Sequence, residues 1–305
     1  MPGTDSGTKK THISMVAGKG GVGKTTCAAA AAVHHALGGE TTLIISTDPT
    51  PSLSHIFEVE DRQKPARVMD RLYLAELGVE EIKQMWDRKF GREVYEVFSS
   101  LVAVGYAEFV DFITSVLPGI GDEFMVDYIK ELSQDRKYDH IIWDTAPLGQ
   151  TLGLLQAPAM LSEHLKPAPR IYSRLKLGGE TKKSVLDIIR GWASLSNDDI
   201  DFLKYQVKFV IITIPEALAV AQLDGIFDEI NKHGLTPDQL VINNVVEDSD
   251  GSSFLKARAE QQKGYLELLF ARYQGIKIVK LPLFPGEIKG IDRLKELERY
   301  LFPVE

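Results

Sequence analysis

The clearest chemical signature in the chain is a short glycine-rich stretch, "GKGGVGKTT", at positions 18–26. It follows the phosphate-loop pattern G-x-x-x-x-G-K-[ST], in which glycines let backbone N–H groups close around a phosphate. Lys24 would neutralise the β- and γ-phosphates, and the Thr25 hydroxyl would ligate Mg²⁺. The alternative is a glycine-rich turn between a strand and a helix. We predict ATP and Mg²⁺ as cofactors, with the nucleotide held by Gly18, Gly20, Gly21, Val22, Gly23, Lys24, Thr25 and Thr26.

A second lysine, Lys19, follows the first glycine of this stretch. The run "KGGVGKTT" matches the deviant Walker A signature of a dimeric class of phosphate-loop proteins. In that class this lysine reaches the nucleotide bound to the partner, much as an arginine finger does. An arginine finger raises the rate of nucleotide hydrolysis by ~10³–10⁵. The signature therefore predicts a homodimer in which Lys19 acts in trans. A solvated surface lysine is the alternative.

Two aspartates lie at the ends of predicted strands and could act on the same phosphates. Asp48, in "STDPTPSLS" (46–54), could orient the attacking water. Asp144, in "HIIWDTAPLGQT" (140–151), could hold the water shell of Mg²⁺ as a Walker B residue. An Asp-Pro turn would explain Asp48 equally simply, and Asp144 could be a cap or turn residue. We predict catalytic roles for Asp48, Lys19 and Lys24, and metal-binding roles for Thr25 and, through water, Asp144.

Two later segments could contact the base of the nucleotide. Asn243 lies in "LVINNVV" (240–246), and an asparagine side chain can pair with an adenine edge. Pro282, in "LPLFPGEIKG" (281–290), could close over the base from the other side. An Asn-Asn pair is also ordinary turn chemistry.

These residues need a sheet to position them. Near-continuous apolar strands separated by helical stretches indicate a parallel sheet covered on both faces. The alanine-rich run 24–37 predicts a helix after the glycine loop, ended by Gly38 and Gly39. The fold class is thus α/β, a phosphate-loop NTPase with a mostly parallel twisted sheet flanked by helices. Strands are expected at 12–17, 41–47, 140–145, 207–213, 240–246 and 276–281, with 72–77 as a weaker edge strand.

Two intervals have a purely helical pattern. Apolar residues recur every three or four positions within 78–135, until "PGIGDE" (118–123) breaks the pattern. The second interval, about 152–204, opens with prolines and a Gly-Gly pair in 165–180, which indicates a mobile stretch. We expect one ATPase domain over 1–305, with both insertions forming a helical subdomain and with 1–10 flexible.

The composition excludes several classes of protein. No apolar run reaches the ~18 residues of a membrane span, and "MPGTDSGTKK" lacks the apolar segment of a secretory signal. The single cysteine, Cys27, excludes a multi-cysteine metal site within one chain. The net charge of −8 argues against a nucleic-acid-binding surface. A cytoplasmic protein with no nucleic-acid partner is expected.

Together these motifs resemble the family of arsenite-pump-driving ATPases and of the tail-anchored-protein targeting ATPases of the guided-entry pathway, over roughly residues 12–302. The resemblance implies a soluble, nucleotide-switched homodimer that presents a helical, often methionine-rich groove to a hydrophobic client. It also implies roles for six residues: trans contact (Lys19), phosphate (Lys24), Mg²⁺ (Thr25), water activation (Asp48), Walker B (Asp144) and adenine (Asn243). The motifs that carry it are "GKGGVGKTT", "STDPTPSLS", "PGIGDE", "WDTAPLGQTLGLL", "TIPEALAV", "VINNVV" and "LPLFPGEIKG".

The chain departs from this family in its cysteines and methionines. Targeting members carry a C-x-x-C pair through which two protomers share one zinc. Here the segment reads "EDSDGSSFLKARAE" (247–260), with Gly251 and Phe254 at the cysteine positions, so no zinc is expected. The arsenite-binding cysteines are missing too. Methionine is scarce in the helical insertions, whereas adaptable client surfaces favour it.

Two functions remain in view. The preferred one is a targeting factor or chaperone whose partners are the transmembrane segment of a client and a possible membrane receptor. The alternative is an energy-coupling ATPase of an arsenite-type or other efflux system, which the missing cysteines disfavour. A partition ATPase shares the lysine signature, but no C-terminal amphipathic membrane helix is evident. Phe109, Phe112 and Ile113, beside Trp86 and Phe90, could line a client groove or simply pack against each other.

Overall fold

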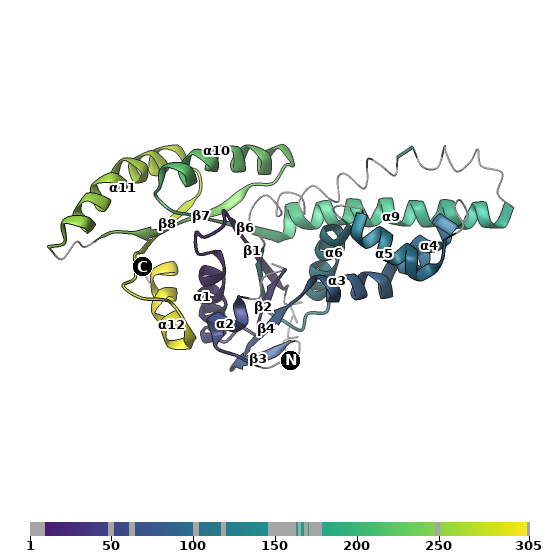
Figure 1. Cartoon of the computed structure of the whole chain (residues 1–305), viewed down its shortest axis with the longest axis horizontal. Coiled ribbons are helices and arrows are strands. Elements are labelled where there is room, and N and C mark those ends of the chain that lie inside the picture. The colour runs from purple at the N-terminus through teal and green to yellow at the C-terminus, as the bar shows by residue number, and fades with distance from the viewer. Residues whose placement is uncertain are drawn as a thin grey trace, which may run out of the picture. The chain divides into compact units, whose positions relative to one another are not determined.

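The computed structural model describes residues 10–47, 52–60, 65–99, 104–116, 120–145, 163, 166–167, 170, 179–247 and 251–303. The chain divides into two compact units, each described here by itself. Residues 1–76, 131–149 and 207–305 form the first, which we call the sheet unit (Figure 1). Residues 77–130 and 150–206 form the second, which we call the helical unit.

The sheet unit contains an eight-stranded sheet in the order β3-β4-β2-β5-β1-β6-β7-β8. All neighbouring strands are parallel except β3 and β4. The α/β fold class and the six principal predicted strands are confirmed, although β7 begins three residues earlier than expected. The strands are β1 (His12–Gly18), β2 (Thr42–Ser46), β3 (Ala66–Met69), β4 (Leu72–Glu76), β5 (His140–Asp144), β6 (Val207–Thr213), β7 (Pro237–Val245) and β8 (Lys277–Pro282).

The position expected for the edge strand is wrong. The run 72–77 forms β4, but β3 pairs antiparallel outside it and is itself the edge. Strand β3 has only four residues, "ARVM", and this is too short to show a period of two in the sequence. Its pairing also shifts register between Arg67 and Met69, as often occurs at sheet edges.

Helices cover both faces of the sheet. Helix α1 (Lys24–Leu37) matches its predicted bounds, and Gly39 beyond it has a φ of +88°. Its alanines include several with no exposed surface, because small side chains let the helix lie close to the strands. Helices α2 (Leu53–Phe57) and α12 (Gly290–Leu301) lie on the same side as α1 (Figure 1). Helices α10 (Ala217–Lys232) and α11 (Ser253–Arg272) lie on the opposite side.

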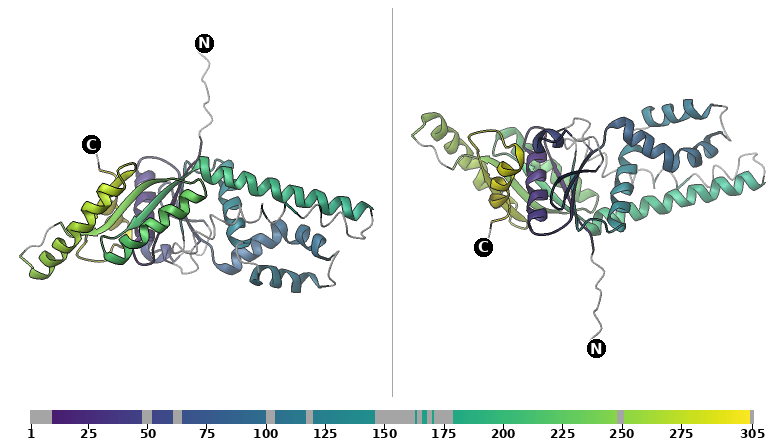
Figure 2. Two further views of the ribbon diagram at one scale, coloured as in Figure 1. Left: turned by 90° about the horizontal axis from the view of Figure 1, so that it is seen from above. Right: turned by 90° about the horizontal axis from the view of Figure 1, so that it is seen from below.

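The helical unit is assembled from short helices and one long one (Figure 2). They are α3 (Val79–Trp86), the π-helical turn η1 (Asp87–Gly91), α4 (Arg92–Ser99), α5 (Tyr106–Val116), α6 (Ile120–Gln134) and α9 (Gly179–Gln206). Because α6 begins at Ile120, the break expected over 118–123 is wrong for its last four residues.

Two of the aromatic residues considered for a client groove are buried. Trp86 is 5% and Phe109 1% exposed, and the Phe109 ring centroid lies 5.3 Å from that of Tyr95. The side chains of Phe112 and Ile113 lie outside the described residues, as do residues 1–9 and most of 165–178. None of the helices described is long and apolar enough to cross a membrane.

Candidate functional site

The glycine loop lies at the carboxyl end of β1, the strand between β5 and β6, and leads directly into α1. A Cβ on Gly18 would lie 2.4 Å from the Ile212 carbonyl oxygen, and one on Gly23 would lie 2.4 Å from the Asn243 amide nitrogen. Gly21 and Gly23 have φ values of +79° and +93°, which side-chain-bearing residues rarely adopt. A Cβ on Gly20 or Gly21 would meet nothing within 4 Å. The loop is therefore tightly held at both ends and open between them.

The start of α1 is built to receive an anion. No described side chain caps it, and its first turn contains no acidic residue. The first intrahelical bond runs from the Cys27 N–H to the Gly23 carbonyl at 3.0 Å. The partial positive charge of the first turn therefore faces the glycine loop without a competing carboxylate. These features fit the phosphates of a nucleotide.

Lys24 lies within the loop rather than in solvent. The residue is 7% exposed, and its ammonium nitrogen donates to the Lys19 carbonyl oxygen at 3.3 Å. A lysine folded over the loop adds a full positive charge to the helix end. Lys19 is partly exposed, as are Thr25 and Thr26, while Val22 is buried.

Asp144 lies at the end of β5 beside the phosphate loop. It is fully buried, and its Oδ2 accepts a hydrogen bond from the Ser46 hydroxyl at 3.3 Å. Strand pairing puts Asp144 opposite both Ser46 and Val16, and the Thr145 hydroxyl donates to the Val16 carbonyl at 2.8 Å. Three strand ends are thus tied together next to the loop. Asp48, two residues after Ser46, lies outside the described residues.

The single cysteine is part of this packing and is chemically inert. Cys27 is buried in α1. Burial, together with the negative charge of Asp144, raises the pKa of the Cys27 thiol to about 12. The thiol therefore stays protonated near neutral pH and is a poor nucleophile or metal ligand.

Asn243 contacts the phosphate loop itself. Its amide nitrogen donates to the Val22 carbonyl oxygen at 2.9 Å. The sequence did not indicate this brace. Asn243 lies two residues before the end of β7, beside Asn244, whose φ is +58°. Pro282 lies on the neighbouring strand, opposite Val245, and is partly exposed. The base-binding roles of Asn243 and Pro282 stay predictions.

Residues 251–260, part of the segment expected to replace the cysteine pair, contain the start of a helix. Gly251 has a φ of +79°, and the Ser252 hydroxyl accepts from the Leu255 N–H at 3.3 Å, which caps α11. Phe254 is 69% exposed in the first turn of α11. Gly251 and Phe254 thus belong to a helix start, and their correspondence to the cysteine positions stays a prediction.

The chain is similar to known ATPases over most of its length. The family model described as anion-transporting ATPase matches residues 11–303. ATPase GET3A from Arabidopsis thaliana is 30% identical, over 95% of this chain and 83% of the relative. A putative arsenical pump-driving ATPase 2 from Aquifex aeolicus is 28% identical, over 95% and 99%. ATPase GET3 from Kluyveromyces lactis is 29% identical, over 96% and 90%.

Proposed function

Because the chain belongs to the anion-transporting ATPase family, we propose that it is a Mg²⁺-dependent ATPase that works as a nucleotide-switched homodimer and shields hydrophobic tail segments of membrane proteins. The proposal rests first on the glycine loop, with Lys24 folded over it and the uncapped start of α1 behind it. This arrangement is suited to a triphosphate, because a helix end and a lysine add their positive charges at one point.

The metal-binding and water-activating roles follow from the ends of neighbouring strands. Thr25 and Asp144 would hold Mg²⁺, which neutralises charge on the phosphates when bound. The buried Asp144 accepts a hydrogen bond from Ser46 through one carboxylate oxygen, Oδ2. Asp48 would orient the attacking water. Asp48→Asn should leave nucleotide affinity nearly intact and slow hydrolysis, because only the chemical step uses this carboxylate.

The homodimer is proposed from Lys19, whose side chain is partly exposed at the start of the loop. In the deviant Walker A class this lysine acts on the partner's nucleotide. Lys19→Ala should bind nucleotide but fail to dimerise with a non-hydrolysable ATP analogue, as sedimentation would show. A variant that dimerises and hydrolyses ATP like the wild type would remove the trans role.

The client is proposed from the resemblance to the targeting ATPases and from the cysteine content. Arsenite sensing needs several thiols, and the only cysteine here is buried and protonated. The Aquifex relative nonetheless bears the name of an arsenical pump-driving ATPase, so efflux coupling is the second candidate. Since Trp86 and Phe109 are buried, a groove that used them would require the helical unit to rearrange.

Co-expression with a tail-anchored protein tests the proposed client. We expect a complex whose yield depends on ATP, and no complex when charged residues interrupt the client's transmembrane segment. Arsenite should leave hydrolysis unchanged. Failure to capture any tail segment, combined with stimulation by arsenite, would replace the targeting function with the efflux function.

A further inference from the structure

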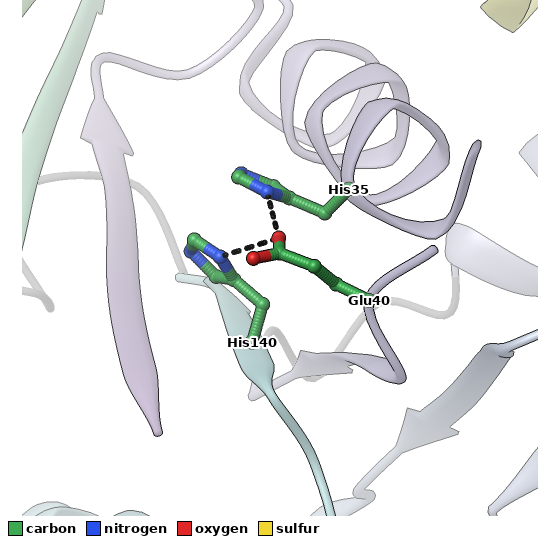
Figure 3. Close-up of side chains that lie close together, drawn as sticks. All are labelled: His35, Glu40 and His140. Carbon is green, nitrogen blue, oxygen red and sulfur yellow. Dashed lines mark hydrogen bonds and ion pairs between the residues drawn. The ribbon is translucent and has the colours of Figure 1, made fainter. Parts of the chain in front are cut away.

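Two histidines and a glutamate from separate parts of the chain meet at the far end of α1 from the phosphate loop. His35 lies in the last turn of α1, Glu40 in the turn that follows, and His140 at the start of β5 (Figure 3). Pairing of β2 with β5 places Thr42 opposite His140, and this brings Glu40, two residues earlier, to the same point. Figure 3 shows both imidazole rings next to the same carboxylate.

The ligand-bearing atoms of these three residues lie close together. The Glu40 Oε2 is 2.6 Å from the His35 Nδ1 and 3.6 Å from the His140 Nδ1. All three residues can offer ligand atoms within 4.8 Å of one another. Zinc bonds of about 2.0–2.1 Å separate neighbouring tetrahedral ligands by roughly 3.3 Å. The 2.6 Å contact is a hydrogen bond in which the His35 Nδ1–H donates to the Glu40 carboxylate, so a metal ion would replace this proton. Small side-chain rotations would then give all three residues a common metal ion.

His140 has an unsatisfied nitrogen that faces this point. The residue is 7% exposed, and its Nδ1 is buried without a hydrogen-bond partner among the described residues. The 3.6 Å separation from Glu40 is too long for a hydrogen bond. The other ring nitrogen, Nε2, lies 3.1 Å from the Ser14 hydroxyl. When Nε2–H donates to Ser14, the Nδ1 lone pair is directed at the carboxylate, and a cation between them satisfies both.

The packing of the two rings suits a metal ion. The two ring centroids are 3.6 Å apart, so two charged imidazoliums would repel each other strongly. Neutral imidazole is the form that binds metals, and the Ser14 contact would fix the tautomer in the way that outer partners of metal-bound histidines do.

We propose that His35, Glu40 and His140 bind one divalent transition-metal ion, with Zn²⁺ as the best match to two nitrogens and one carboxylate. The fourth ligand would be water, because the side chains of His35 and Glu40 are 20% and 35% exposed and leave a path from solvent. This site lies within one chain and uses no cysteine. It is therefore distinct from a zinc shared between two protomers.

The proposed ion would tie the end of α1 to the start of β5. Lys24 begins the same helix, roughly 16 Å away at 1.5 Å per residue, and Asp144 ends the same strand. The ion would therefore hold together the two elements that carry the phosphate loop and the Walker B aspartate, at the ends remote from the nucleotide. Binding to the folded state alone would stabilise the sheet unit.

Zinc titration of tag-free protein tests the site, with Mg²⁺ in excess and nucleotide absent. We expect calorimetry to find one Zn²⁺ per chain and thermal unfolding to shift upward in its presence. His35→Ala and Glu40→Gln should each weaken zinc affinity at least about tenfold and reduce the shift. Glu40→Gln keeps the size of the side chain, so its melting temperature without zinc should stay close to that of the wild type.

His233→Ala is the matched control. The His233 side chain is 25% exposed and also lies beside a carboxylate, at 3.4 Å from Glu229 in the sheet unit, but it is not part of the three-ligand cluster. This variant should bind zinc like the wild type. Wild-type protein without a one-to-one site, or His35→Ala and Glu40→Gln variants with unchanged affinity, would overturn the proposal.

Co²⁺ substitution gives a second measurement that does not depend on how the variants fold. The wild-type protein should show visible d–d bands of a four-coordinate nitrogen and oxygen site, without a thiolate charge-transfer band. A thiolate band would assign the ion to Cys27 and would also overturn the proposal.

Discussion

Buried charged side chains have different kinds of partner in the two units of the chain. In the sheet unit, the buried Asp144 lies next to an open loop and is held by a neutral hydroxyl from Ser46. In the helical unit, acidic and basic side chains from different helices form a chain of ion pairs. Lys89 of η1 pairs with Asp127 of α6, and Lys130 of α6 pairs with Asp199 of α9. Asp127 and Lys130 are themselves 3.4 Å apart. A buried ion pair adds little net stability, because the cost of removing both charges from water offsets their attraction.

The two units also differ in what surrounds these charges. The sheet unit rests on an apolar core that includes the alanines of α1 and the inner faces of the strands. Such a core is close-packed and resists deformation. The helical unit buries apolar side chains too, among them Phe124 and Phe202, and it adds ion pairs between α6, η1 and α9. Any movement of these helices against one another would have to break or exchange those pairs.

Among the single substitutions predicted here, we expect the one at Asp199 to have the largest effect, a loss of stability in the helical unit. Asp199→Ala should destabilise the helical unit by an amount at the lower end of about 3–5 kcal/mol at pH 8, because Lys130 stays buried and loses the nearer of the two acidic partners described for it, Asp199 and Asp127. Hydrogen exchange in α6 and α9 would measure the change, and nucleotide affinity should be unaffected. Asp187→Ala, which breaks an exposed pair with Arg190 on α9, is the control and should cost below about 1 kcal/mol. Equal effects of the two substitutions would remove the distinction between buried and exposed pairs.

The corresponding change in the sheet unit is Lys24→Ala. It should leave the fold intact but weaken nucleotide binding on the order of 100-fold, since hydrogen bonds to a charged group are worth about 1.5–3 kcal/mol. Fluorescence titration with a labelled ATP analogue would measure it. Lys232→Ala, an exposed lysine paired with Glu229, should bind like the wild type. A Lys24→Ala variant with wild-type affinity would mean that the loop binds no phosphate.

The pH dependence of stability should also separate the two units. Burial raises the pKa of Asp199 to about 7, against the opposing effect of Lys130. The folded state therefore holds a proton that the unfolded state, with a pKa near 3.9, releases. Stability from this group is present at low pH and is lost as the pH rises toward 7, at up to about 1.4 kcal/mol per pH unit. Exchange in α9 between pH 5 and 8 should show this slope, and Asp199→Asn should abolish it.

The sequence predicted the strand and the helix that hold the glycine loop because they adjoin it in the chain. One loop contains the glycines, Lys24 and Thr25, and the apolar runs on either side reveal the strand and helix that hold it. The edge strand β3 was missed because four residues carry no detectable period. The histidine cluster was missed because Glu40 and His140 meet only through the pairing of β2 with β5. No local spacing rule could show that contact.

We expect the smallest effect, a change in nucleotide affinity, from substitution of Asn243. The base contact predicted from the sequence and the loop contact in the structure lead to different expectations for ATP and GTP. Its amide donates to the Val22 carbonyl and also lies where a Cβ on Gly23 would be. Asn243→Ala would remove one neutral hydrogen bond, worth about 0.5–1.5 kcal/mol, and should weaken all nucleotides by a few-fold. Because the brace acts on the loop, ATP and GTP should lose affinity equally. If Asn243 instead recognises adenine, the substitution should weaken ATP alone and reduce the preference for ATP over GTP. Parallel titrations of both nucleotides would decide between a loop brace and a base contact.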